Sequence, residues 1–251
     1  MHRFYVDPGE SGNDLLELSE REAHHASNVL RLKEGERVVV LDGQGSEICC
    51  NVQKVGKRGV MLQVYRRNKV PPLPYQLTLV QAIPKGKTME TIVQKAAELG
   101  AWKVVPIITD RTVTQLDEDR SDSKIEKWTW IAIDAIKQCG STWLPTIAEP
   151  VRPATYLGMK DSSEMTLIAS LQPGSKHPRL HFRDFEREHG RRPKSISVWV
   201  GPEGDFTPAE VNTVLGSGAL PITLGPLVLR SETAAFYCLS MVNYEMQSPR
   251  D

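Results

Sequence analysis

Three prolines within five residues, in Val70-Pro71-Pro72-Leu73-Pro74, constrain the fold of this chain more than any other feature. Proline has no backbone N–H to donate and its φ angle is fixed, so this stretch cannot continue a central β-strand. The sequence pattern also changes here, from short strands and turns to strands that alternate with longer helical periods. We therefore predict a linker at this point, with one domain over residues 1–70 and a second over residues 74–251.

The first part has the pattern of a small β-barrel. Apolar segments over 38–41, 48–55 and 60–65 are separated by turn residues such as Gly43. A helix is predicted before these strands, over residues 19–30, because Ser19 lies three residues before Glu22 as in a capping box.

The second part predicts an α/β domain with a largely parallel sheet. Its clearest element is a helix over 88–99, whose apolar residues share one face and whose end is marked by Gly100. Strands are expected over 77–80, 104–108, 166–171, 195–200 and 221–224, and further helices over 124–139 and up to Met246. The charge-rich segments 117–122 and 177–192 lack a periodic apolar face, so solvated loops or exposed helices are expected there.

Composition and charge limit the possible functions. No apolar run approaches the roughly 18 residues of a membrane span, and the N-terminus lacks the apolar core of a secretory signal, so we expect a cytosolic protein without a membrane partner. The formal net charge is +0, which argues against bulk attraction to nucleic acid. Acidic residues are nevertheless absent between Glu47 and Glu90, where lysines and arginines gather. This window predicts either contact with a polyanion or a solvated basic surface.

Several classes of site have no support in the sequence. The four cysteines lack zinc spacing, and no metal, hydrolase or dinucleotide motif occurs, so reduced thiols and no metal are expected. Gly86-Lys87-Thr88 is similar to the end of a phosphate-binding loop, but Gln81 stands where its first glycine should be.

The segment from Val198 to Glu210 has the pattern of a strand, a ligand loop and a helix. An apolar strand runs into Gly201 and Gly204, which let the backbone come close to a ligand. Thr207 follows as an N-cap, with a proline at the first helical position and an acid at the third. An ordinary tight turn would give the same pattern, so this segment alone leaves both possibilities open.

A second loop, from Leu224 to Arg230, is long and partly hydrophobic. It places Arg230 and Glu232 at the start of an apolar helix, which is unusual for a plain connector. The helix carries apolar residues on two faces, so we expect it to pack against its sheet and a second surface. That surface belongs either to a homodimer partner or to the interior of a monomer.

Gly201-Pro202-Glu203-Gly204 and the two runs Leu224-Gly225-Pro226 and Leu229-Arg230-Ser231-Glu232-Thr233-Ala234 closely resemble the two cofactor-loop motifs of the ribosomal RNA small subunit methyltransferase E family. The resemblance extends to residues 22–31, 85–100, 110–113 and 138–140, and so covers nearly the whole chain. The order of these motifs along the chain makes the match specific.

The resemblance implies an N-terminal PUA-like RNA-binding β-barrel followed by a SPOUT α/β domain with a C-terminal trefoil knot, one of the exceptions to the rule that chains avoid knots. It implies a homodimer and S-adenosylmethionine as methyl donor. The implied cofactor-binding residues are Leu171, Gly201, Pro202, Glu203, Gly204, Leu224, Gly225, Leu229, Arg230, Ser231, Thr233 and Ala234.

The function that the resemblance implies is methylation of a uridine N3 in 16S ribosomal RNA, with that RNA or the small ribosomal subunit as partner. The chain departs from the family at Ser141-Thr142-Trp143, where basic residues are frequent, and at Leu227, where arginine is frequent. Trp143 either stacks on a base or is buried in the fold. Two other functions stay open: a SPOUT methyltransferase for a different RNA nucleotide, and a non-catalytic RNA-binding assembly factor.

The chemistry suggests roles for two residues. Uracil N3 is a poor nucleophile until its proton leaves, so a cation should stabilise the developing anion. Arg230 is the catalytic candidate because its guanidinium is always charged; the alternative is a salt bridge that orders the knot. Glu232 either stabilises the helix start or receives the proton.

RNA docking is predicted at six cationic or histidine residues, with a solvated surface as the alternative: Arg3, His24, Arg31, Lys85, Lys87 and Arg111.

Overall fold

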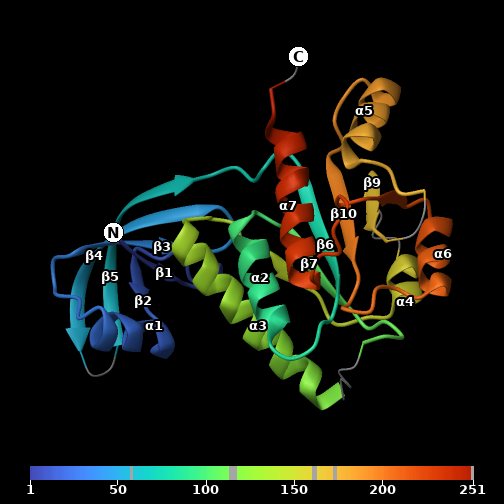
Figure 1. Cartoon of the computed structure of the whole chain (residues 1–251). Helices are drawn as coiled ribbons and strands as arrows, with labels where there is room; N and C mark the ends of the chain where they lie inside the picture. The colour runs from blue at the N-terminus through green and yellow to red at the C-terminus, as the bar shows by residue number, and fades with distance from the viewer. Residues whose placement is uncertain (57–58, 113–117, 160–162, 172–173, 250–251) are drawn as a thin grey trace. The chain divides into compact units, whose positions relative to one another are not determined.

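The computed structural model describes residues 1–56, 59–112, 118–159, 163–171 and 174–249. Contacts between Cα atoms divide the chain into two compact units (Figure 1). The first contains residues 1–72 and 133–144, and the second contains 73–132 and 145–251. The chain passes from one to the other within the proline-rich stretch at 70–74. The segment 133–144, expected in the second part of the chain, clusters with the first unit.

The first unit is built on a five-stranded sheet in the order β1-β3-β4-β5-β2. The strands are β1 (His2–Tyr5), β2 (Leu15–Glu17), β3 (Arg37–Leu41), β4 (Ser46–Gly56) and β5 (Gly59–Lys69). β1 pairs with β3 in parallel, and the other pairings are antiparallel. β3, β4 and β5 confirm the three predicted strands. β1 and β2 are short, and no sequence pattern pointed to them.

The helix predicted near residues 19–30 changes character along its length. It begins as α1 (Glu20–His24) and continues as a π-helical turn, η1 (His25–Val29). The Ser19 hydroxyl accepts a hydrogen bond from the Glu22 amide at 3.4 Å, as predicted. The Glu22 carboxylate does not complete the capping box but pairs with Lys137 Nζ at 2.5 Å, with Glu22 only 1% exposed. A buried ion pair therefore joins this helix to the segment 133–144.

The second unit contains a six-stranded parallel sheet in the order β11-β9-β10-β6-β7-β8. The strands are β6 (Gln76–Ala82), β7 (Lys103–Ile107), β8 (Thr146–Ile147), β9 (Met165–Ala169), β10 (Ser195–Val200) and β11 (Leu220–Ile222). This confirms the predicted α/β domain with a parallel sheet. Because all these strands run the same way, their carboxyl ends meet at one edge, where parallel α/β sheets bind ligands.

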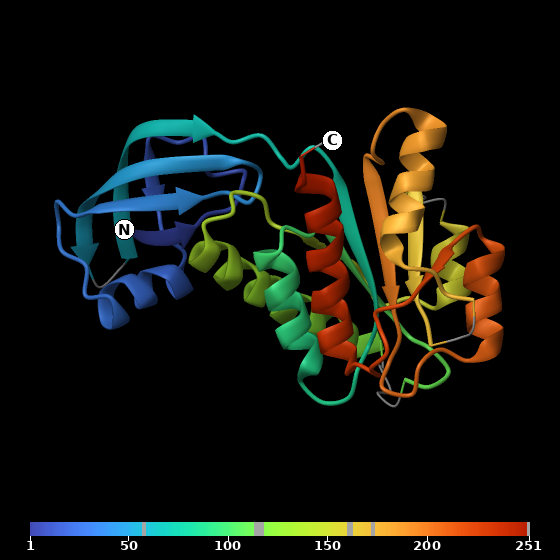
Figure 2. The same cartoon turned by 45° about the horizontal axis from the view of Figure 1, so that its top comes forward.

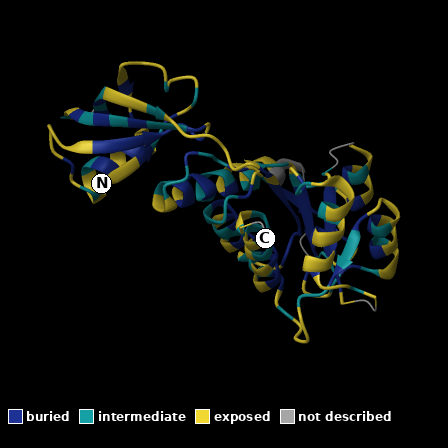
Figure 3. Ribbon diagram, turned by 90° about the horizontal axis from the view of Figure 1, so that it is seen from above, coloured by how far each residue is buried: buried dark blue, intermediate teal, exposed yellow. Residues whose placement is uncertain are grey.

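Helices cover both faces of this sheet. Figures 1 and 2 show α2 (Thr88–Glu98) and α7 (Ser231–Gln247) on one side, and α4 (Pro153–Gly158), α5 (Pro178–His189) and α6 (Pro208–Gly216) on the other. α2 ends, as predicted, before Gly100 in the left-handed conformation at φ +73°. The strands between the helices are the most buried part of the unit (Figure 3).

The two charge-rich segments are helical where the structure describes them, which is one of the two forms expected for them. The helix predicted over 124–139 begins earlier, as α3 (Glu118–Cys139). The segment 177–192 forms α5, which does have a core face, because it buries Pro178, His181 and Phe182. Two apolar residues in three helical turns are too few to give a visible period in so charged a sequence. They are enough to form a buried face once the helix packs against the sheet.

None of the helices in the described part of the chain is long and apolar enough to cross a membrane. All four cysteines are free thiols. Cys50 and Cys238 are buried, and burial raises the pKa of each to about 12, so these two stay protonated. Cys139 is exposed.

Candidate functional site

A cavity of about 490 Å³ lies at the carboxyl ends of β9, β10 and β11. Its walls come from residues 169–171 with 174–175, from 200–205, from 223–229, and from the first turn of α7. This volume is typical of a pocket for a small organic ligand. The only charged residues among the described lining are Glu203 and Asp205, so the pocket favours a neutral or cationic ligand.

The loop after β10 is shaped by a tight backbone turn at Gly201. A Cβ atom at Gly201 would lie 3.0 Å from Asp205 Oδ1 and 3.3 Å from both Asp205 Cα and Phe206 Cδ2. Asp205 itself has a positive φ of 59°, and its Oδ1 accepts a hydrogen bond from the Phe206 amide at 2.8 Å. Phe206 is 1% exposed and belongs to the core of the unit. Any side chain at position 201 would therefore crowd Asp205 and Phe206.

The start of α6 fixes the other end of this loop. Thr207 and Glu210 form the predicted capping box: the Thr207 hydroxyl accepts from the Glu210 amide at 3.3 Å, and Glu210 Oε2 accepts from the Thr207 amide at 2.8 Å. The second carboxylate oxygen of Glu210 accepts from the Asp110 amide at 2.8 Å. One glutamate thus joins the helix start to the loop after β7.

Two further contacts anchor the middle of the loop. Glu203 Oε1 accepts a hydrogen bond from the Lys85 amide at 2.9 Å. The Arg111 guanidinium donates to the carbonyl oxygen of Gly204 and, at 3.5 Å, to that of Phe206. The loop after β10 is consequently held by the segments that follow both β6 and β7.

The two cofactor-loop motifs meet at Ser231, the first residue of α7. Ser231 Oγ donates to the Gly201 carbonyl oxygen at 2.7 Å and accepts from Gln81 Nε2 at 2.9 Å. Ser231 is 5% exposed and Gln81 is fully buried. A buried hydrogen-bonded chain therefore runs from β6 through the helix start to the end of β10.

The loop from 223 to 230 forms the outer wall of the cavity. Thr223 Oγ1 accepts from the Gly225 amide at 3.2 Å, and Gly225 has a positive φ of 104°. Three apolar side chains at the cavity are largely exposed: Leu171 by 63%, Leu227 by 73% and Val228 by 78%. The cavity thus combines a polar backbone rim with an apolar wall.

The structure gathers nearly all predicted cofactor residues around this cavity. Only Arg230 and Thr233 of that set are not among its lining residues. Asp205, Leu227 and Val228 also line the cavity and lie inside the two predicted loops. Six further lining residues were not predicted from the sequence: Ala169, Ser170, Gly174, Ser175, Val200 and Thr223. Pro173-Gly174 is a turn signal shortly after Leu171, and it was the sequence feature that could have extended the predicted site beyond Leu171 on this side.

The two predicted catalytic residues lie beside the cavity, at the start of α7. Arg230 is the N-cap residue of α7, with an exposed side chain. Its guanidinium makes no ion pair or hydrogen bond with the described residues, so the salt bridge considered as its alternative role is not formed there. Glu232 lies half-buried in the first helical turn, where a carboxylate interacts favourably with the helix dipole.

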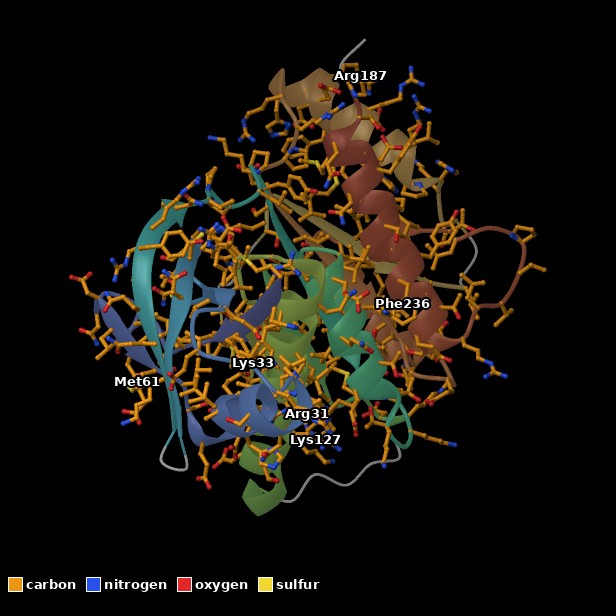
Figure 4. The ribbon with its side chains drawn as sticks, turned by 90° about the vertical axis from the view of Figure 1, so that its left-hand side faces the viewer. Arg31, Lys33, Met61, Lys127, Arg187 and Phe236 are labelled. Carbon is orange, nitrogen blue, oxygen red and sulfur yellow. The ribbon has the colours of Figure 1, made fainter. Side chains whose placement is uncertain are left out.

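The predicted RNA-docking residues fall into two groups. Arg3 and Arg111 are exposed but already bind within the fold: Arg3 Nη1 donates to the carbonyl oxygens of Lys137 and Gln138 at 3.1 and 3.2 Å, at the end of α3. The other four, His24, Arg31, Lys85 and Lys87, have exposed side chains. Arg31 follows η1 with a positive φ of 55°, and Figure 4 shows it beside that helix.

Trp143 has a structural role in the first unit. Its indole nitrogen donates to the Val70 carbonyl oxygen at 3.0 Å. A Cβ atom at Gly45 would lie 2.6 Å from Trp143 Cζ2, so the indole packs directly on that backbone. The side chain is half-buried, which agrees better with the packing role than with base stacking.

Comparison with known proteins identifies the class to which this fold and cavity belong. A sequence model of the RNA methyltransferase domain matches residues 71–243, more than half of the chain, and a model of the RNA methyltransferase PUA domain matches residues 18–65. The chain is therefore a member of the RNA methyltransferase family.

Individual relatives narrow the assignment of the chain to one family of RNA methyltransferases. The ribosomal RNA small subunit methyltransferase E of Bacillus subtilis is 31% identical, over 98% of this chain and 98% of the relative. The enzyme of the same name from Aquifex aeolicus is 32% identical, over 96% of this chain and 99% of the relative. The chain belongs to the ribosomal RNA small subunit methyltransferase E family.

Solved structures agree. A methyltransferase of Legionella pneumophila in complex with S-adenosylmethionine has a TM-score of 0.85 and 32% identity, covering 96% of both chains. The ribosomal RNA small subunit methyltransferase E of Neisseria gonorrhoeae, bound to S-adenosylmethionine, has a TM-score of 0.84 and 25% identity, covering 97% of both chains. The fold is thus a PUA domain followed by a SPOUT methyltransferase domain.

Proposed function

We propose that this protein transfers a methyl group from S-adenosylmethionine to N3 of a uridine in 16S ribosomal RNA. The observation that carries the proposal is the cavity at the carboxyl ends of β9, β10 and β11, whose walls are the two cofactor-loop motifs of the family. Two similar proteins of known structure have S-adenosylmethionine bound.

The residues of the cavity fit this cofactor. Gly201 lines the cavity and has no side chain of its own there, so its backbone can approach a ligand closely. The apolar wall that contains Leu171 and Leu227 suits a purine ring. S-adenosylmethionine carries a positive sulfonium, and Glu203 and Asp205 supply the only charges of the described lining. When bound, the cofactor supplies an electrophilic methyl group.

The chain itself must present the uracil and stabilise its anion. Arg230 lies between the lining residues Leu229 and Ser231, and no described residue engages its guanidinium, so this group is free to hold a uracil carbonyl oxygen or a neighbouring phosphate. A fixed positive charge at that point favours the anion that forms as the N3 proton leaves. Glu232, in the first turn of α7, stabilises the helix start and so the position of Arg230.

The remaining family features belong to the same proposal. The first unit would contact RNA through His24 and Arg31, and the second through Lys85 and Lys87, because their cationic or titratable side chains are exposed. The exposed apolar residues Leu227 and Val228 support a homodimer that covers the cavity rim. The loops around Ser231 would be threaded through a trefoil knot, and the protein would act in the cytoplasm.

The test is nucleoside mass analysis of 16S ribosomal RNA from cells with and without the gene, combined with methyl transfer by the purified chain to subunits from the deletion strain. A 3-methyluridine that disappears on deletion and returns in the reaction supports the proposal. A different methylated nucleotide would assign the chain to another specificity, and binding of RNA without S-adenosylmethionine would assign it to ribosome assembly.

A further inference from the structure

A fully buried glutamine lies beneath the first turn of α7. Gln81 is the next-to-last residue of β6, in the middle of the parallel sheet, and its exposed fraction is 0%. Leu77 and Leu79, which share its face of the strand, are also fully buried. An apolar side chain is the ordinary occupant of such a position, because burying an amide is unfavourable unless all its polar atoms are paired.

The hydrogen bonds of Gln81 have a fixed direction. Its Nε2 donates to Ala82 O at 2.8 Å and to Ser231 Oγ at 2.9 Å. The Ser231 hydroxyl has one proton, which it donates to Gly201 O at 2.7 Å, so its oxygen must accept from Gln81. If the amide were flipped, its oxygen would face the lone pairs of Ala82 O and could not form this hydrogen bond. Gln81 therefore acts as the donor that orients Ser231.

The amide oxygen of Gln81 has no such partner. Oε1 is buried and makes no hydrogen bond with the described residues. A buried oxygen without a donor destabilises a fold, so this glutamine is a poor choice for stability alone. What it achieves is the placement of a hydroxyl between two loops that both line the cavity.

We propose that Gln81 is a positioning residue of the methyltransferase site. It acts through Ser231 to hold the first turn of α7 against the end of β10, and so fixes the spacing between the loop 201–205 and the loop 223–230. Gln81 itself does not line the cavity. The inference rests on the proposed function, because the spacing it fixes is that of the cofactor pocket.

The opposite end of α7 provides a matched comparison. Asn243 Nδ2 donates to Leu99 O at 2.7 Å, and Asn243 Oδ1 accepts from the Tyr75 hydroxyl at 2.7 Å. This anchor lies twelve residues from Ser231, which is about 18 Å along a helix. It fastens the same helix with the same chemical group, an amide, but neither Asn243 nor Tyr75 lines the cavity.

The experiment compares Gln81→Leu, Ser231→Ala, the double variant and the control Asn243→Leu in the full-length protein. S-adenosylmethionine affinity is measured by calorimetry, and thermal unfolding is measured on the same samples. We expect Gln81→Leu and Ser231→Ala each to weaken binding about three- to tenfold, the effect of one neutral hydrogen bond. The double variant should be no weaker than the worse single one, because both remove the same contact. Asn243→Leu should unfold at a lower temperature yet bind with wild-type affinity.

A second variant without the donor sharpens the test. Gln81→Met keeps the approximate size of the side chain but has no N–H to donate, so it should bind as weakly as Gln81→Leu. Wild-type affinity in Gln81→Leu or Gln81→Met, additive losses in the double variant, or an equal loss in Asn243→Leu would each overturn the inference. If Gln81→Leu does not fold, Gln81→Met and the control decide the question. A wild-type protein that does not bind S-adenosylmethionine would refute the proposed function as well.

Discussion

Gly201→Ala is the substitution that most directly probes the shape of the cavity. The added methyl group would lie 3.0 Å from Asp205 Oδ1 and 3.3 Å from Asp205 Cα and Phe206 Cδ2. Ordinary carbon contacts are about 3.5 to 4.0 Å, so at least two neighbours must move by a few tenths of an ångström. Neither moves freely, because Asp205 is hydrogen-bonded to the Phe206 amide and Phe206 is buried in the core.

Crowding of this kind in a packed region costs about 1 to 3 kcal/mol. For a chain of this size, each kcal/mol lowers the midpoint of thermal unfolding by about 2 to 4 °C. Gly201→Ala should therefore reduce the free energy of unfolding by about 1 to 3 kcal/mol in the absence of any ligand. The same displacement would move the Gly201 carbonyl oxygen away from Ser231, so the affinity for S-adenosylmethionine should also fall.

The measurement is urea denaturation of the ligand-free protein, with Gly204→Ala as the matched control. Gly204 lies in the same loop, but the nearest atom to its added methyl group is Arg111 Cδ at 3.4 Å, an ordinary contact. The control should change stability by less than about 0.5 kcal/mol. Equal stability of the two variants would show that the loop yields easily and that the geometric reasoning is wrong.

Four further predictions follow from the described contacts. Thr207→Ala removes the capping box of α6 and should lower the free energy of unfolding, measured by urea denaturation, by about 1 kcal/mol. The control Thr213→Ala removes an exposed hydroxyl in the middle of the same helix and should be nearly neutral, and equal effects of the two would contradict the role of the cap. Glu22→Gln leaves Lys137 with the exposed Asp134 as its one ionic partner among the described residues and should cost about 3 kcal/mol or more in the free energy of unfolding. Glu20→Gln, at an exposed position of the same helix, should change stability little, and a Glu22→Gln protein as stable as wild type would show that the pair is not needed. Arg230→Ala should lower the methyl-transfer rate while leaving S-adenosylmethionine affinity nearly intact, and equal loss of both in kinetics and calorimetry would reassign Arg230 to cofactor binding or folding. Burial opposes ionisation of Asp42, but hydrogen bonds from Ser46 and Gln44 and the charge of Lys69 outweigh burial and lower the pKa of Asp42. The ionised carboxylate therefore contributes stability above its ordinary pKa of about 4, and this contribution is lost as the pH falls through the lowered pKa. The stability difference between wild type and Asp42→Asn should accordingly shrink below pH 4, and a difference independent of pH would argue against this assignment.

The sequence by itself determined the elements whose information is local. The helix before Gly100, the capping box at Thr207 and the break at the proline-rich stretch depend on periodicity, backbone donors and left-handed caps, all of which lie within a few residues. The two cofactor-loop motifs could be recognised for the same reason, because their glycines and the following helix start lie next to each other in the chain. The parallel sheet followed from the alternation of strands and helices.

Only the tertiary structure decided which distant groups meet. Nothing local in the sequence links Gln81 to Ser231, because their contact depends on α7 lying over the end of β6, 150 residues earlier in the chain. The same is true of Glu22 with Lys137 and of Arg111 with Gly204, where residues expected to cap a helix or bind RNA are engaged by the fold. Side-chain partners of this kind depend on how distant elements pack together. Such packing leaves no periodic pattern in the sequence from which it could be predicted.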